Sequence, residues 1–341
     1  MRILRLLCLA ALSLTACGPD TRPFKLVTSA DLTPTGLVDA DGIFGVVAND
    51  DLVVVGRRRG ELLVFDGNQA FLTTKPLEDQ ALSRVSLDDT TGAGCLAMRG
   101  TTVYAGLAGN TLKVISLADP KKPVITDSLI IIPLPVVATL NSHFLFISSR
   151  VRTQAIDLST SPPTVVSPEL PLTSVLALAA SDTHLYSSDM SREAAIDVWA
   201  LDAKGGAAHE QRVPVTSRIT ALTVHGSTLY AANAGVLALF DLTSADGPKA
   251  LNPKPGIVRH TQTWTRGEGM QGVAVMGTQN AVGPSNGPVF YDLSKPEAVE
   301  GASTDDVMLA GGELELQNYA AATRARFWTA GETKVFVFGR E

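Results

Sequence analysis

The feature that most constrains the fold is a repeat that runs through most of the chain. Five segments end alike, as LKVISL, TQAIDL, IDVWAL, LALFDL and PVFYDL, and each closes on a leucine. A period of roughly 40 to 50 residues is typical of the blades of β-propellers. The closing residues, at intervals of 41, 43, 41 and 51 residues, are Leu117, Leu158, Leu201, Leu242 and Leu293.

Each repeat has the pattern of a β-hairpin. A second short apolar strand, such as Val103–Tyr104 or Leu229–Tyr230, lies 12 to 15 residues before the closing leucine. That distance fits two strands joined by a tight or bulged turn. Prolines such as Pro120 and Pro296 follow the second strand. Because proline has no N–H to continue a ladder, it ends the strand and begins the crossing to the next unit.

The same hairpin pattern extends the repeat to both ends of the chain. Leu52–Val55 precedes Glu61–Asp66 across GRRRG, and Arg326–Thr329 precedes Lys334–Phe338. Many of these strands are continuous apolar runs, which suits blades covered on both faces. We therefore predict an all-β fold over residues 24–341, a single β-propeller of six to seven four-stranded blades, with seven favoured. Phe24–Thr28 is placed to close the ring beside the last strand.

The strand ends carry a family resemblance. SLADPKKP at 116–123 and DLSKP at 292–296 resemble the LVIVD-repeat propellers of secreted and surface bacterial proteins, over about residues 43–300. The resemblance implies a propeller outside the cytoplasm and no shared catalytic motif. GELLVFDGNQ at 60–69 is similar to the PQQ-type propellers, which include lipoproteins of outer-membrane barrel assembly. Those repeats carry a tryptophan in each blade, whereas this chain has only Trp199, Trp264 and Trp328.

The N-terminus predicts export. Arg2 and Arg5 precede an apolar run from Leu6 to Leu14, which is the layout of a secretory signal and is too short to span a bilayer. Leu14, Thr15, Ala16 and Cys17 resemble the lipobox of bacterial lipoproteins. That resemblance implies a signal peptide over residues 1–16, cleavage before Cys17, and a diacylglyceryl group on the thiol of Cys17. Residues 17–23 would form the lipidated tether.

The same resemblance gives the expected location and membrane partner. Acyl chains on Cys17 would bind the lipid bilayer firmly, since each buried methylene contributes about 0.8 kcal/mol. Gly18 stands where aspartate would retain a lipoprotein in the inner membrane, which favours the outer membrane if the source is Gram-negative. Cys8 would leave with the signal and Cys17 would be modified, so Cys95 stays alone and no intrachain disulfide is expected.

Charge argues against a nucleic-acid partner. The chain has 28 basic and 34 acidic residues. Loss of Arg2 and Arg5 leaves 26 basic residues and a net charge of −8. A protein that binds nucleic acid is expected to lean the other way. No sequence motif indicates a cofactor, and none is expected.

Three kinds of candidate site have a plainer structural explanation. Gly283–Gly287 matches G-x-S-x-G, but the stretch leads into a strand rather than a helix, so we predict a hairpin loop around Ser285. His143 and His184 take equivalent repeat positions where other copies have threonine, which favours a turn role over a metal site in the channel. The remaining histidines show no metal-ligand spacing and are His209, His225 and His260.

The recurring aspartates and one arginine cluster also have a plainer structural explanation than a binding site. Asp66, Asp157, Asp241 and Asp292 could together hold a cation, but aspartate at a strand end more often hydrogen-bonds the turn that follows. DADG at 39–42 lacks the other ligands of a calcium loop. The arginines at 57–59 could grip an anionic partner, although a solvated hairpin tip explains them more simply.

The sequence thus predicts no catalytic, cofactor-binding or metal-binding residue. We expect a non-enzymatic, membrane-anchored binding or scaffold protein that presents its rims to a protein or cell-envelope partner. One alternative is a propeller enzyme, a hydrolase or lyase, with its site in the central channel. Another is a periplasmic assembly factor resembling the PQQ-type propeller lipoproteins.

Overall fold

The computed structural model describes the strands and most of their connections. It covers residues 25–31, 42–69, 75–87, 94–149, 151–166, 168–189, 194–233, 236–252, 274–276, 280–283, 289–293, 296–298, 300–303, 319–331 and 334–339. The lipobox at Leu14–Cys17, residues 39–41 of the DADG stretch and His260 lie outside these residues. Within them, no helix is long and apolar enough to cross a membrane.

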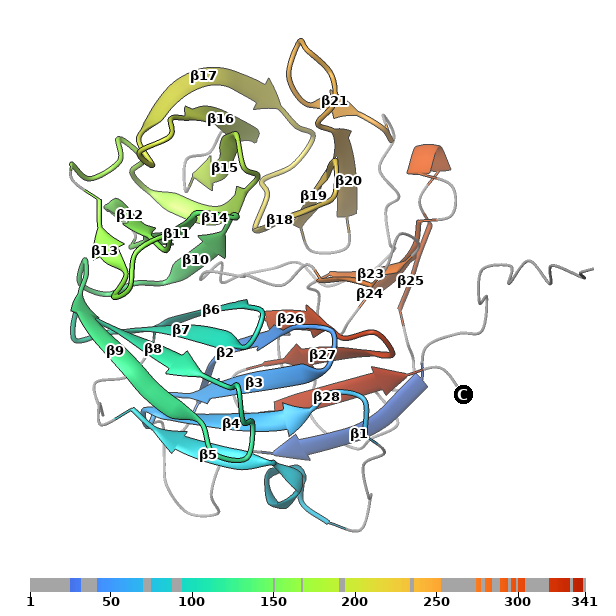
Figure 1. The fold of residues 1–341 in the computed structure, drawn as a ribbon. Coiled ribbons are helices and arrows are strands. Elements are labelled where there is room, and N and C mark those ends of the chain that lie inside the picture. The colour runs from blue at the N-terminus through green and yellow to red at the C-terminus, as the bar shows by residue number, and fades with distance from the viewer. Residues whose placement is uncertain are drawn as a thin grey trace, which may run out of the picture.

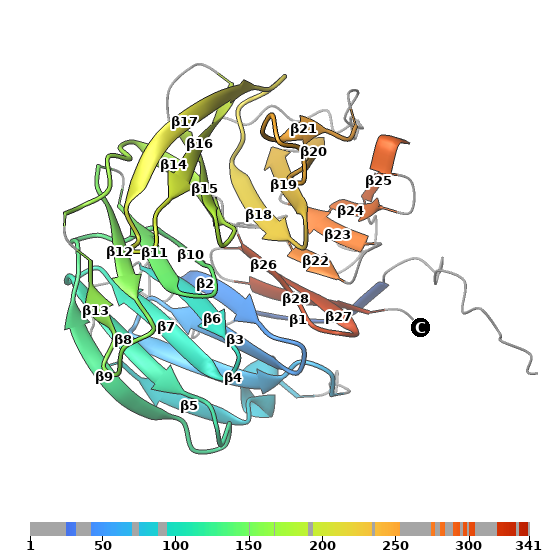
Figure 2. The same ribbon diagram turned by 45° about the horizontal axis from the view of Figure 1, so that its top comes forward.

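The described strands form seven four-stranded antiparallel sheets around a common centre, as Figures 1 and 2 show. Six of these sheets consist of four consecutive strands, and the remaining sheet joins β1 to β26, β27 and β28. We number the sheets as blades 1 to 7 in chain order and call the strands of each blade A to D from the inside outward. The predicted all-β propeller with four-stranded blades is confirmed.

The strand bounds are as follows. Blade 1 contains β2 (Ile43–Ala48), β3 (Leu52–Arg57), β4 (Glu61–Asp66) and β5 (Ser83–Ser86); blade 2 contains β6 (Cys95–Arg99), β7 (Thr102–Leu107), β8 (Thr111–Ser116) and β9 (Val124–Ile130). Blade 3 contains β10 (Val137–Leu140), β11 (Phe144–Ser148), β12 (Thr153–Asp157) and β13 (Thr164–Val165); blade 4 contains β14 (Val175–Ala180), β15 (His184–Asp189), β16 (Ala195–Leu201) and β17 (Ala207–Pro214).

Blades 5 to 7 complete the ring. Blade 5 contains β18 (Ala221–His225), β19 (Thr228–Asn233), β20 (Val236–Asp241) and β21 (Lys249–Ala250); blade 6 contains β22 (Ala274–Met276), β23 (Asn280–Gly283), β24 (Val289–Asp292) and β25 (Glu300–Ser303). Blade 7 contains β26 (Tyr319–Ala322), β27 (Arg326–Ala330), β28 (Lys334–Gly339) and β1 (Lys25–Asp31). Two short 3-10 helices, η1 (Leu77–Gln80) and η2 (Pro296–Ala298), lie in connections from strand C to strand D.

The N-terminal strand closes the ring. β1 pairs with β28 in antiparallel register from Lys25 opposite Gly339 to Asp31 opposite Lys334, and Figure 1 shows the two strands side by side. Closure of the ring by an N-terminal strand, as predicted, is therefore confirmed. Blade 7 also packs on blade 1, where the rings of Trp328 and Phe65 lie 5.4 Å apart.

The hydrophobic core lies mainly between neighbouring blades. All six residues of β3 are buried, and so are the central residues of β4 and β7. A strand covered on both faces must be apolar on both, which explains the continuous apolar runs of strands B and C.

The antiparallel order of the strands gives the propeller two rims. The A–B turns and C–D connections lie on one rim, which we call the A–B rim. The B–C turns and D–A connections lie on the other, which we call the B–C rim. The rim at which a residue lies therefore follows from its place in the blade.

Candidate functional site

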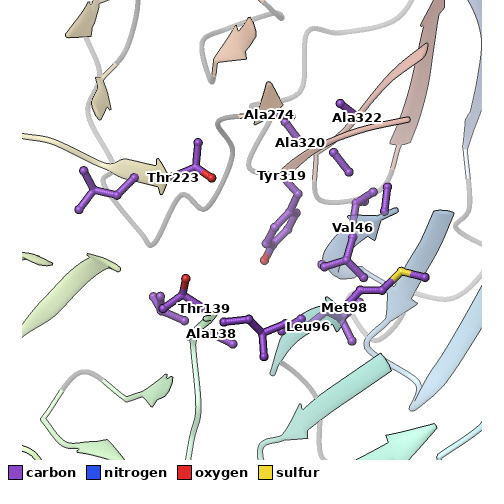
Figure 3. Close-up of a pocket in the computed structure, with 18 of the residues that line it drawn as sticks. Val46, Leu96, Met98, Ala138, Thr139, Thr223, Ala274, Tyr319, Ala320 and Ala322 are labelled. Atoms are coloured by element: carbon purple, nitrogen blue, oxygen red, sulfur yellow. The ribbon is translucent and has the colours of Figure 1, made fainter. Parts of the chain in front are cut away.

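The candidate site is the central channel, which is lined by the innermost strand of every blade. It has a volume of about 330 Å³. The strands β2, β6, β10, β14, β18, β22 and β26 all contribute to the wall. Figure 3 shows the apolar part of the lining, which includes Val46, Leu96, Met98, Ala138 and Ala274.

The polar side chains of the channel are almost all uncharged. Thr139, Thr223 and Tyr319 come from three different blades, and in Figure 3 their hydroxyls lie toward the middle of the channel. Among the described lining residues, His225 and Tyr319 are the ionisable ones. The described wall therefore offers hydroxyl groups but not the paired acid and base that hydrolysis or elimination would use.

The recurring aspartates lie at C–D turns and not in the channel. Oδ1 of Asp157 accepts a 2.8 Å hydrogen bond from the backbone N–H of Ser159, and Oδ1 of Asp241 accepts one of 2.9 Å from that of Thr243. The side chain of Asp66 accepts a hydrogen bond from the turn that follows its own strand, in the same way. The hydrogen bonds from Ser159 and Thr243 lower the pKa of Asp157 and Asp241. The prediction of a turn role is confirmed for these three residues. Asp292 is the last residue of β24, where the structure describes its backbone alone, so the turn role of its side chain stays a prediction.

The two histidines predicted to be equivalent differ by one position. His184 begins strand B of its blade, as Thr102 and Thr228 do, whereas His143 precedes its strand B. Both lie at A–B turns, so a place at a turn is correct but the equivalence is wrong. Nε2 of His184 lies 3.0 Å from Oε2 of Glu210 on the outer strand β17.

Histidine and carboxylate side chains do not gather into a metal site in the part of the chain that the structure describes. No group of three or more His, Cys, Asp or Glu residues there could hold a metal ion.

The G-x-S-x-G match at 283–287 lies between the two paired strands β23 and β24, and of the match itself the structure describes Gly283. Gly283 ends β23 and pairs with Val289, which begins the antiparallel strand β24. A nucleophile elbow needs a turn from a strand into a helix. The described residues on either side of the match are two antiparallel strands and not a strand and a helix. Ser285 itself lies outside the described residues.

The arginine cluster is partly buried, which corrects the prediction of a solvated tip. The turn at 58–60 does join β3 to β4 as expected. However, the side chain of Arg57 is only 6% exposed and forms ion pairs of 3.0 Å with Glu61 and 3.7 Å with Glu78. Arg57 therefore stabilises the outer part of blade 1, while Arg59 is exposed at the tip.

One polar cluster was missed because its members lie on two different strands whose register the sequence does not show. On blade 4, Oδ1 of Asp197 lies 3.2 Å from Nε2 of His209 and 3.5 Å from Nη1 of Arg212. Trp199 meets the ring of His209 edge-on at 4.9 Å. The pairing of Asp197 with Arg212 across β16 and β17 brings the charges together. The signal in the sequence would have been opposite charges on two strands of known register.

The A–B rim also contains a series of hydrogen bonds between blades that the sequence did not indicate. Asn49 in blade 1 donates to the carbonyl of Gly100 in blade 2 at 2.8 Å. Arg99 donates to the carbonyl of Ser142 in blade 3, and Asn141 donates to that of Ser181 in blade 4. Each of these side chains stands in or beside an A–B turn, so the turns of the first four blades are locked to one another.

Comparison with known proteins establishes the fold and no family. No family model matches the chain, and no curated protein matches it. A solved structure of the WD40 domain of Pan2 from Neurospora crassa is similar, with a TM-score of 0.65 and 12% sequence identity, over 94% of this chain and 96% of that one. At this identity the likeness shows a shared propeller architecture alone.

Proposed function

We propose that the chain is an exported lipoprotein, anchored through Cys17, whose propeller is a non-enzymatic binding or scaffold protein of the cell envelope. The lipobox-like residues at 14–17 and the LVIVD-like strand ends support the extracytoplasmic setting. Gly18 supports the outer membrane if the source is Gram-negative.

The observation that carries the binding role is a group of exposed apolar side chains on the B–C rim. Ile130, Leu134 and Val151 are 78%, 64% and 68% exposed, and we call them the rim patch. Among the described residues, every large hydrophobic side chain classed as exposed lies between Val124 and Val165, in blades 2 and 3. Exposed apolar side chains that gather on one rim, rather than being scattered singly over the surface, are typical of a surface that docks a protein.

The backbone beneath the rim patch is fixed by hydrogen bonds. The N–H of Leu134 donates to the carbonyl of Ala108 in blade 2, and the N–H of Val136 donates to that of Ser148 in blade 3. Leu134 has a φ of 52°, a left-handed conformation that is uncommon for a residue with a Cβ. The surrounding hydrogen bonds fix the backbone from which the side chain of Leu134 projects, and such preorganisation favours binding.

Charge on the same rim indicates the chemistry of the partner. The B–C turns and D–A connections carry Arg58, Arg59, Arg152 and Arg218, of which Arg152 pairs with Glu169 on the same rim at 3.4 Å. The recurring aspartates lie on the opposite rim. A protein surface that presents apolar side chains beside carboxylates would complement the rim patch and its arginines.

The anchor would turn the rim patch away from the membrane. β1 begins at Lys25 beside Gly339, at the end of a strand C, and therefore on the A–B rim. Eight residue steps separate Cys17 from Lys25 and span about 28 Å at most. A short tether that enters at the A–B rim leaves the B–C rim facing outward from the bilayer.

Catalysis is supported less well than binding. The described channel wall lacks a carboxylate beside its one histidine, so the hydrolase or lyase alternative has no pair of groups to carry it. The alternative of an assembly factor resembling the PQQ-type propeller lipoproteins would use a protein-docking rim of the same kind. The identity of the crosslinked partner in the experiment below would distinguish it.

The anchor is tested by replacing Cys17 in the full chain. We expect wild-type protein to incorporate an alkyne-labelled fatty acid and to sediment with one membrane fraction on a density gradient. Cys17→Ser should do neither. Normal processing and soluble release of Cys17→Ser would show that the anchor proposal is wrong.

The rim patch is tested with a photo-crosslinking amino acid at Leu134 in cells, and at Thr160 on the A–B rim as the matched control. We expect a discrete product from Leu134 that disappears when Ile130→Ser and Val151→Ser are added. Identification by mass spectrometry should show a contact segment with apolar and acidic side chains. Equal crosslinking from Thr160, or a product that persists in the serine variants, would refute the docking surface.

A further inference from the structure

Three hydroxyl groups from distant parts of the chain face the central channel. Thr139 is in β10 of blade 3, Thr223 is in β18 of blade 5, and Tyr319 is in β26 of blade 7. All three line the channel, and Figure 3 shows the phenol of Tyr319 reaching into it from the side opposite Thr139 and Thr223. The arrangement of the blades in a ring therefore brings three neutral polar groups together in the central channel.

The backbone adds further hydrogen-bonding groups to this wall. Each innermost strand is the edge of its sheet and pairs with a neighbouring strand on one side alone. Half of the N–H and C=O groups of such an edge point away from the sheet, which here means toward the axis. Donors and acceptors thus surround the channel between patches of aliphatic side chain such as Val46, Leu96 and Met98.

The channel is large enough for a small molecule. Its volume of about 330 Å³ falls in the lower part of the range of ligand pockets. This volume corresponds to roughly ten water molecules in the liquid. A ligand of that size with several hydroxyl groups would exchange hydrogen bonds with water for hydrogen bonds with the wall.

Charge decides the class of ligand. The described wall has no Asp, Glu, Lys or Arg side chain, and its one histidine, His225, lies at the last residue of β18. An ionised ligand would lose its hydration without gaining an opposite charge, which is costly. A hydroxyl group both donates and accepts, so it can pair with Thr139, with Thr223 and with either kind of backbone group.

We propose that the channel binds a small neutral polyhydroxy molecule, a polyol or monosaccharide, through the hydroxyls of Thr139, Thr223 and Tyr319. This site goes beyond the docking role of the rim patch and does not depend on it. The aliphatic side chains between the hydroxyls would pack against the C–H faces of such a ligand.

The test measures binding of four probes to the full-length lipoprotein by saturation-transfer NMR and titration. Glucose and myo-inositol are the neutral probes, and gluconate and glucosamine are the charged ones of similar size. We expect millimolar or tighter binding of at least one neutral probe and no detectable binding of the charged ones. Equal binding of neutral and charged probes, or no binding of any probe, would overturn the proposal.

Isosteric variants place the binding in the channel. Thr139→Val with Thr223→Val keeps the volume of the wall and should weaken the affinity for the bound neutral probe roughly tenfold, since two hydrogen bonds to the ligand are lost. Thr160→Val on the A–B rim is the matched control and should leave binding unchanged. The same loss in the control, or no loss in the double variant, would refute the site. Crosslinking from Leu134 in the double variant reports on the rim patch separately.

Discussion

The backbone N–H of Leu158 donates a 2.9 Å hydrogen bond to the carbonyl of His143. The same bond recurs from Leu117 to Thr101, from Leu201 to Thr183, and from Leu242 to Ser227 at 2.7 to 2.9 Å. In blades 2 to 5 the closing leucine is thus the residue that ends the pairing of strands B and C. The leucines that repeat in the sequence therefore occupy the same structural position in their blades.

The aspartates beside these leucines should make stability depend on acid pH. The pKa of Asp157 is lowered by hydrogen bonds from Ser159, and that of Asp241 by hydrogen bonds from Thr243. Because the pKa is lower in the folded than in the unfolded state, this stabilisation is complete above the unfolded value of about 3.9 and is lost as the pH falls through the folded value. We expect the melting temperature to fall below pH 4.

The contribution of the aspartates is measured with a double variant. Asp157→Asn with Asp241→Asn keeps an oxygen acceptor for each turn but removes the titration. Its melting temperature should change less between pH 5 and pH 3 than that of the wild-type protein. If the two curves run parallel over that range, the acid dependence arises elsewhere.

Strands B and C could be predicted because a strand that is buried on both faces is apolar along its whole length. Val103 and Ile115 pair across β7 and β8 and are both fully buried. The hairpin and its closing leucine could then be recognised from a single sequence. The outer strands were harder, because β13 and β21 have only two residues each and have exposed side chains.

The candidate channel could not be predicted because its wall is set by the closing of the ring. Several innermost strands are short, such as β22 with three residues, and the residues of β26, with the sequence YAAA, show no strong strand pattern. Thr139, Thr223 and Tyr319 are far apart in the chain and share no spacing. Their convergence follows from the positions of blades 3, 5 and 7 around the axis.

Gly56 is predicted to be intolerant of any side chain. A Cβ at this position would lie 2.7 Å from Cζ of Phe44, and the ring of Phe44 is buried. Gly56→Ala should lower the free energy of unfolding by about 1 to 3 kcal/mol, measured by urea denaturation. The variant Phe44→Leu relieves the clash, so the double variant should be more stable than the sum of the two single losses predicts. Strict additivity would show that the two residues do not clash.

Closure of the ring should depend on Trp328. Its side chain is fully buried between blades 7 and 1, with its ring 5.4 Å from that of Phe65. Trp328→Ala should lower the free energy of unfolding by about 3 to 5 kcal/mol. Trp199→Ala, at a partly exposed site on blade 4, is the control and should cost less. A smaller loss in Trp328→Ala than in the control would mean that this contact does not hold the ring.

Cys95 should be unreactive in the folded protein. Its thiol is fully buried, and burial raises its pKa to about 12. Since the thiolate is the reactive form, a folded chain carrying Cys8→Ser and Cys17→Ser, with Cys95 as its one thiol, should not react with a disulfide reagent at pH 8. The same chain in 8 M urea should react completely.

Because the pKa of Cys95 is raised on folding, the thiol favours the folded state below the unfolded pKa of about 8.5, and this contribution is lost as the pH rises toward 12. Rapid labelling under native conditions would show that β6 opens and that the wall of the channel at blade 2 is not fixed.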